Sequence, residues 1–359
     1  MATACKRPGL LALLEGPQTL GKGPRFWISF VLFLSAACAY PLFADGYDVG
    51  NNVYFFNWAF MAMGLSLIWG YGGALSFGQT AFFGVAGYTY GIISINLGDA
   101  YGLTLFALLA SVAASALMAA VLGYFLFFGR ISGVFLGIVT LSVTLVLERF
   151  MAQTAGPEWR VGSARLNGFN GMGGMPSLTI PWLGGDIALF PDVPLYYVTL
   201  ALLVVIYLAL RMLVNSRFGN VLVAIRENPQ RAEMLGYDIR RYQLAAFVIG
   251  SALAGLSGVL YTSWGNYITP ASMGMTAASL PIVWVAVGGR SDLTTTLLGT
   301  LLVLGGFQAL TIHGSQYALI VMGLLLVATV LMAPNGLVYA LGTLLSGRLR
   351  RRVREREAL

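Results

Sequence analysis

The chain has 359 residues, of which 58% are hydrophobic and only 10% are charged, and its formal net charge is +7. With a mean hydropathy of +0.78, the sequence has too little polar surface to coat a soluble globule of this size, so the composition excludes the soluble classes. Its two cysteines and one histidine cannot by themselves form a disulfide scaffold or a metal site.

Apolar stretches follow one another along most of the chain, each close to the length of about 17 to 25 residues that crosses a bilayer as a helix. The sequence therefore predicts an all-α, polytopic transmembrane helix bundle with about ten spans, within residues 26–333. The expected spans are residues 26–43, 53–72, 80–97, 102–128, 131–150, 193–213, 243–263, 273–289, 293–312 and 316–333. The stretch 273–289 is short and contains Pro281, so a re-entrant or broken segment is the alternative there.

The basic residues predict the orientation of the chain, because Lys and Arg are retained on the cytoplasmic side of a membrane. With the N-terminus inside and ten crossings, 18 of the 21 basic residues fall on the cytoplasmic side, and Arg149, Arg160 and Arg165 fall outside. Both termini are then cytoplasmic, as an uncleaved segment of residues 1–25 and a basic tail of residues 334–359. The basic residues cluster at the ends of apolar segments, which predicts a lipid bilayer and no nucleic acid as the partner.

The most charged predicted loop, residues 214–242 on the cytoplasmic side, carries the signals of one short helix. Asn228 suits the N-cap, Pro229 the first helical position, and Gly236 the left-handed residue after the C-cap. A helix of about two turns is not stable alone in water, so it docks either on the chain's own helix ends or in a partner.

Docking in a partner would use the apolar residues of this short helix and leave its charges at the rim. The expected inserted groups are Ala232, Met234 and Leu235. The charged residues expected at the rim of this contact are Arg226, Glu227, Arg231 and Glu233. Their ion pairs with a partner would contribute little to binding affinity but would fix how the two surfaces align.

Residues 70–80 interrupt the hydrophobic pattern with a run of glycines between the second and third expected spans. Such backbone at membrane depth is tolerated where it lines a cavity or is covered by protein. If this segment lines a translocation path, Ser76, Gln79 and Thr80 supply its neutral hydrogen-bonding groups. The alternative is an ordinary helix hairpin.

Other glycines are expected to serve turns and helix packing. The external loop, residues 151–192, contains Asn167, Gly168, Asn170 and Gly171, where glycines permit left-handed backbone. Small residues at four-residue spacing let helices approach closely, and they are Gly87 and Gly91, Gly133 and Gly137, and Gly250, Ala254 and Gly258.

The sequence lacks the residues that several other kinds of membrane protein need. No segment matches a glycine-rich phosphate loop ending in Gly-Lys-Ser/Thr, so ATP hydrolysis would have to occur in another chain. An ion-coupled transporter ordinarily uses buried carboxylates, and Glu148, beside Arg149, is the one acid close to a span interior. No cluster of His, Asp, Glu or Cys at one depth supports a membrane enzyme.

Three stretches together resemble the branched-chain amino acid permease family of bacterial ABC importers, particularly its M-type subunit. They are WGYGGALSFGQTAFFGVAGYTY at residues 69–90, GFNGMGGMP at 168–176, and SRFGNVLVAIRENPQRAEMLGYDIRRYQLAAFVIGSALAGLSGVLY at 216–261. The resemblance extends over roughly residues 53–337, and the third stretch is the most specific. The family usually has an acidic or polar pair where this chain has Asn228 and Pro229.

The resemblance implies a multi-pass permease of the bacterial inner membrane that performs no covalent chemistry. Its expected partners are a homologous second permease subunit, two cytoplasmic ATPase subunits that bind the ATP, and an external solute-binding protein. Residues 228–236 would then be the element that contacts the ATPase. The expected solute is a branched-chain or other neutral amino acid, and urea or a short-chain amide is the alternative because such permeases are relatives.

Overall fold

The computed structural model describes residues 13–98, 102–180, 187–189, 192–333 and 336–341. Within these residues, seven helices are long and apolar enough to cross a membrane, and two shorter apolar helices accompany them, Met275–Gly288 and Tyr317–Thr329. The fold is therefore that of a polytopic helical membrane protein. Most of the predicted basic tail and residues 1–12 lie outside the part of the chain that the structure describes.

Most of the membrane-length helices begin and end within a few residues of the expected spans, but the second begins at Gly46, seven residues before the expected start at residue 53. The helices are α2 Pro24–Ala39, α3 Gly46–Leu65, α4 Gln79–Ile93, α6 Thr104–Phe128, α7 Val134–Ala152, α8 Val193–Asn215, α9 Arg217–Glu227, α10 Pro229–Met234, α11 Ile239–Gly265, α12 Met275–Gly288 and α13 Leu293–Met332. A 3-10 turn, Tyr40–Leu42, extends α2, and π-helical turns, Ser66–Tyr71 and Ser94–Gly98, extend α3 and α4. A second 3-10 turn, Pro270–Met273, precedes α12.

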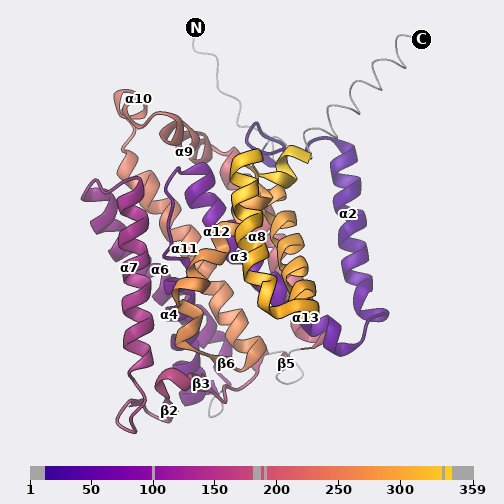
Figure 1. The fold of residues 1–359 in the computed structure, drawn as a ribbon, viewed down its shortest axis with the longest axis vertical. Helices are drawn as coiled ribbons and strands as arrows, with labels where there is room; N and C mark the ends of the chain where they lie inside the picture. The colour runs from indigo at the N-terminus through magenta and orange to yellow at the C-terminus, as the bar shows by residue number, and fades with distance from the viewer. Residues whose placement is uncertain (1–12, 99–101, 181–186, 190–191, 334–335, 342–359) are drawn as a thin grey trace.

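Short β-ribbons join some of these helices at one end of the bundle, which we call the ribbon end (Figure 1). They are the antiparallel pairs β1 Arg160–Val161 with β2 Ala164–Arg165, β3 Met172–Gly173 with β6 Tyr267–Ile268, and β4 Leu178–Ile180 with β5 Ile187–Leu189. A further 3-10 turn, Gly168–Asn170, lies just before β3. The opposite end carries α9 and α10 and is called the coupling-loop end (Figure 1).

Helices α3, α4 and α11 form the centre of the bundle and pack closely through glycines. A Cβ added at Gly250 of α11 would lie 2.5 Å from the carbonyl oxygen of Gly64 in α3, and one at Gly258 would lie 2.1 Å from that of Phe83 in α4. Such contacts confirm the predicted small-residue packing of α11. Gly133 differs, because its φ is +60° and nothing lies within 4 Å, so it serves the turn before α7.

Helix α13 is long enough for about 60 Å if straight, yet its two ends lie side by side. A Cβ added at Gly336, just after α13, would lie 2.3 Å from the α-carbon of Gly289, just before it. The chain therefore turns back within α13, and Figure 1 shows its orange half descending and its yellow half returning. The apolar parts on either side of the turn are Leu293–Ile312 and Tyr317–Thr329, which match the last two expected spans.

The N-terminal segment, residues 13–23, forms hydrogen bonds with α8, with the end of α3 and with the start of α13 at the coupling-loop end. Arg211 of α8 is fully buried and donates hydrogen bonds to the carbonyl oxygens of Leu14 and Gly21. The hydroxyl of Tyr71, after α3, donates to the carbonyl of Gln18 at 3.1 Å.

The same segment also reaches the start of α13. The amide of Leu20 donates to the carboxylate of Asp292, the N-cap of α13, at 2.9 Å. Burial raises the pKa of Asp292, although the amides of Leu20 and Thr295 act in the opposite direction. The expected cytoplasmic N-terminal segment thus includes a packed part of the fold.

Candidate translocation path and coupling loop

The chain between α3 and α4 is interrupted below the coupling-loop end of the bundle. After the π-helical turn Ser66–Tyr71, residues 72–78 run alongside α7 before α4 begins at Gln79. The amide of Phe77 donates to Thr140 Oγ1 at 3.1 Å, and Thr144 Oγ1 donates to the carbonyl of Phe77 at 3.4 Å. Since Thr140 lies more than one turn inside α7, the first turn of α4 also lies inside the bundle.

The three residues predicted for the path gather at this first turn, and all three are buried. Ser76 Oγ accepts a hydrogen bond from the amide of Gly78 at 3.1 Å, so this side chain shapes the entry to α4. Gln79 is 2% exposed and Thr80 is 0% exposed. Neither the amide group of the Gln79 side chain nor the Thr80 hydroxyl has a hydrogen-bond partner.

Further unpartnered polar atoms lie along the same three central helices. An unpaired buried polar group is costly and therefore rare in folded proteins. Besides Gln79 and Thr80, the side chains with such buried atoms are Asn57 of α3, Tyr88 of α4, Ser251 of α11 and Asn266, which follows α11, whereas Tyr90 pairs with Ser263 and Trp58 with Tyr54. Their concentration on α3, α4 and α11 marks a polar strip through the centre of the bundle.

Two contacts join the helices that carry this polar strip. Ser257 Oγ of α11 donates to the carbonyl of Asn57 at 2.6 Å, which sets the two helices at the same depth there. The Trp58 ring stacks on the Phe83 ring with centroids 5.0 Å apart. Of the residues in this strip, the sequence predicts only Gln79 and Thr80 for the path. Asn57, an amide in the middle of an apolar stretch, was the available signal.

At the ribbon end, the loop that is expected to be external packs against α4 through Met172 and Met175, which lie beside Gly91. Asn167, Gly168 and Gly171 have positive φ, as predicted for a glycine-rich turn. The Tyr267 hydroxyl donates to the carbonyl of Asn170, and β3 pairs with β6 beside it. Asn167 and Asn170 are exposed, whereas Gly168 and Gly171 are buried.

The short helix in the loop between α8 and α11 has the caps that the sequence predicts. Asn228 Oδ1 accepts from the amide of Arg231 at 3.0 Å, and Pro229 opens α10. Gly236 follows the C-cap with φ +86°. Both the existence of the helix and its bounds are confirmed.

The apolar side chains of α10 face in two directions. Met234 is 86% exposed and Leu235 is 74% exposed. Ala232 is 1% exposed, within a cluster of this chain's own residues: Val221, Ile225 and Ile239, with Tyr242 packed against them. The expectation that Ala232 inserts into a partner is therefore wrong, because its methyl group holds α10 onto α9 and α11.

Arg226, at the end of α9, connects this loop to the interruption before α4. Its Nη1 donates to the carbonyl of Gly70 at 2.6 Å, and its Nη2 lies 2.7 Å from the Glu227 carboxylate. Gly73 faces the backbone and side chain of Arg226, with a built Cβ 3.0 Å from its Cγ. A displacement of α9 would therefore be transmitted directly to residues 70–78.

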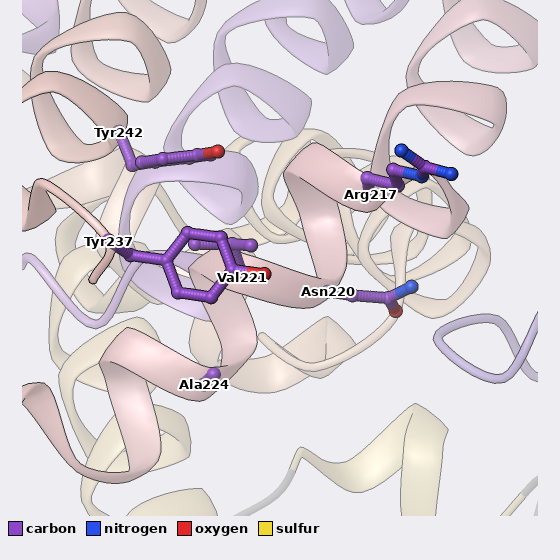
Figure 2. Close-up of a pocket in the computed structure, with 6 residues that line it drawn as sticks. All are labelled: Arg217, Asn220, Val221, Ala224, Tyr237 and Tyr242. Atoms are coloured by element: carbon purple, nitrogen blue, oxygen red, sulfur yellow. The ribbon is translucent and has the colours of Figure 1, made fainter. Parts of the chain in front are cut away.

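A groove beside α9 opens on the same surface (Figure 2). It has a volume of about 590 Å³, and its lining residues are Arg217, Asn220, Val221, Ala224, Tyr237 and Tyr242. Figure 2 shows the Tyr237 and Tyr242 rings at one side of the groove and the Arg217 guanidinium pointing away at the other. Arg231 and Glu233 are exposed on α10, the helix that follows α9 in the chain.

The described residues contain no cluster of three or more His, Cys, Asp or Glu side chains that could hold a metal ion. Glu148, the acid nearest a span interior, lies 3.3 Å from the guanidinium of Arg149.

Comparison with known proteins agrees with this arrangement. Residues 52–330 match the family described as "Branched-chain amino acid transport system / permease component". The chain is 26% identical to the high-affinity branched-chain amino acid transport system permease protein LivM of Escherichia coli, over 86% of this chain and 74% of that protein.

Two other relatives match over shorter segments. The probable LivM permease of Methanocaldococcus jannaschii is 32% identical over 29% of this chain and 31% of its own length. The nucleoside ABC transporter permease protein NupC of Lactococcus lactis is 32% identical over 29% and 35%. No solved structure matches the chain. Because the family match covers most of its length, this chain belongs to the branched-chain amino acid transport permease family and is the permease component of an ABC transport system.

Proposed function

We propose that this chain moves a small polar solute through the bacterial inner membrane by alternating access, driven by two separate ATPase subunits. The solute is a branched-chain or other neutral amino acid. A homologous second permease subunit completes the membrane-spanning part, and an external solute-binding protein delivers the solute. Two of the relatives described above are LivM permeases of branched-chain amino acid transport, which supports this choice over urea or a short-chain amide.

The proposed topology has ten crossings and both termini in the cytoplasm. Helix α12, about 21 Å long, runs from the ribbon β6 at one end toward Arg290, whose carbonyl accepts from Ser66 near the other. The turn within α13 supplies two crossings, and α4 with its π-helical turn supplies another. The coupling-loop end then faces the cytoplasm, where most of the basic residues belong, and the ribbon end faces outward.

The polar strip on α3, α4 and α11 is the proposed translocation path. Its unpartnered atoms on Asn57, Gln79, Thr80 and Ser251 can exchange hydrogen bonds with a polar solute as the helices move apart. The strip has no buried acid, and Glu148 is paired with Arg149 at the end of α7. This composition favours a path for solute over an ion-coupled mechanism.

The hydrogen bond from Arg226 to the Gly70 carbonyl is the single observation that carries the proposal. ATP binding would close the ATPase dimer and move α10 through its exposed Met234 and Leu235. The motion would pass through α9 and Arg226 into residues 70–78, which directly precede Gln79 and Thr80. Partner subunits and path are thus linked by one continuous element.

The test is solute uptake by proteoliposomes that contain the complete complex. Uptake of radiolabelled L-leucine, L-isoleucine, L-valine and urea is measured with ATP, without ATP, and without the binding protein. The proposal predicts amino acid uptake that needs both ATP and the binding protein. Uptake driven by a proton or sodium gradient in the absence of ATP would contradict it.

A further inference from the structure

The first turn of α4 is a helix start that no side chain of the described residues caps. The N-cap residue is Gly78, which makes no side-chain cap hydrogen bond. The amide of Gly78 bonds to Ser76, and those of Ala81 and Phe82 bond to Gly78, but those of Gln79 and Thr80 have no acceptor. These free donors at a helix N-terminus carry the positive end of the helix dipole, which favours an anionic group.

Two buried side chains of the same turn add donors that also lack partners. Gln79 and Thr80 are 2% and 0% exposed, and the Gln79 Nε2 and Thr80 Oγ1 atoms have no hydrogen-bond partner. Buried donors are ordinarily satisfied. The acceptor Gln79 Oε1 is unpartnered as well. With two free backbone amides, the Gln79 side-chain amide and the Thr80 hydroxyl, this turn nevertheless holds more free donors than free acceptors, which points to a missing acceptor.

The facing surface of α11 contributes one more group. Gly258 and Gly255 of α11 contact Phe83 and Ala86 of α4. Ser251 lies one turn after Phe247 of α11, and the Phe247 ring contacts the ring of Phe82 in the first turn of α4. Its hydroxyl is buried and unpartnered as well.

The surrounding charge also suits an anion. Helices α4 and α11 contain no Asp or Glu, and the acid of α3 is Asp48, in its first turn at the ribbon end. On the cytoplasmic side of the turn, Arg226 lies against Gly70 and Gly73. Arg226 is already paired with Glu227, so what favours a carboxylate at the first turn of α4 is its free donors and the absence of an acid on α4 and α11.

We propose that the first turn of α4 binds the carboxylate of the transported solute as the path opens. The groups that bind it are the side chains and the backbone amides of Gln79 and Thr80. The inference rests on the proposed function and deepens it by naming the chemical group recognised inside the membrane. Discontinuous helices in other transporters present their N-termini to anionic groups in this way. Urea and simple amides lack the group that this turn fits.

The test uses the complete complex in proteoliposomes and L-leucine as the probe. Gln79→Leu and Thr80→Val each remove one donor and should lower kcat/KM for uptake about tenfold, the loss expected for one hydrogen bond to a charged group. Gln79→Glu places a carboxylate where the solute's own carboxylate binds. Like charges in one site should lower kcat/KM about 100-fold or more.

Folding and coupling are followed separately in each variant. A carboxylate in the first turn of a helix is favourable, so Gln79→Glu should retain membrane insertion, ATPase binding and the thermal unfolding midpoint. Thr199→Val is the matched control, because Thr199 is equally buried but its hydroxyl bonds to its own helix α8 at Leu195 and Tyr196. Uptake by this control should equal that of the wild type.

Uptake by Gln79→Glu equal to or better than that by Gln79→Leu would overturn the carboxylate site. A wild-type complex that imports urea with ATP but none of the amino acids would instead contradict the proposed function. Failure of the proposed function itself is visible in the wild type alone, as the absence of any ATP-dependent uptake, before a variant is compared.

Discussion

The guanidinium of Arg226 and the carbonyl of Gly70 are joined by a 2.6 Å hydrogen bond, although 156 residues separate them in the chain. The bond connects the loop that carries α10 to the interruption before α4. Charge-assisted hydrogen bonds of this kind are among the stronger ones in proteins. It is therefore well suited to transmit a displacement of α9 to residues 70–78.

Arg226→Ala should uncouple transport without releasing the ATPase subunits. Removing the guanidinium leaves α10 intact but breaks the contact with Gly70, so ATP-dependent uptake should fall about tenfold or more. Glu227→Gln is the control, since it removes the ion pair with Arg226 but leaves the bond to Gly70. Uptake and co-purified ATPase are measured together; equal uptake by both variants would argue against transmission through Arg226.

Cysteine labelling from outside the cell tests the orientation. In a background carrying Cys5→Ser and Cys38→Ser, Ser163→Cys should react with an impermeant reagent, because Ser163 is exposed at the ribbon end. Glu233→Cys, exposed on α10 at the opposite end, should react only after the membrane is permeabilised. The reverse pattern would show that the chain has the opposite orientation. External labelling of both sites would show that the number of crossings between them is even.

Arg211→Met should destabilise the protein by about 2 to 4 kcal/mol, because it leaves buried acceptors without their donor. In the native chain Arg211 donates to Leu14, Gly21 and Tyr207. The exposed Arg217 provides the control, and Arg217→Met should change stability by less than about 0.5 kcal/mol. Thermal unfolding midpoints in detergent separate the two, and equal midpoints would show that the N-terminal segment adds no stability.

The sequence predicted the features that depend on local signals. Capping residues at Asn228, Pro229 and Gly236 define α10 by short-range chemistry, and apolar length defines most of the spans to within a few residues. The burial of Ala232 could not be predicted, because it depends on how α10 docks against α9 and α11. The bond between Arg226 and Gly70 and the turn within α13 are likewise set by tertiary packing.

The central claim is that α10 is the element through which ATPase subunits drive this permease. The exposed Met234 and Leu235 are the groups available to a partner surface. The double variant Met234→Asp with Leu235→Asp should retain membrane insertion and the unfolding midpoint, because neither side chain packs within the chain. Gln230→Asp, also exposed on α10, serves as the control.

Co-purification of the ATPase from detergent extracts, at equal permease levels, is the most direct measurement, with ATP-dependent L-leucine uptake recorded on the same preparations. Burying two carboxylates in an apolar contact is strongly unfavourable, so the double variant should lose the ATPase and uptake together while Gln230→Asp retains both. Full retention of both by the double variant would contradict the account.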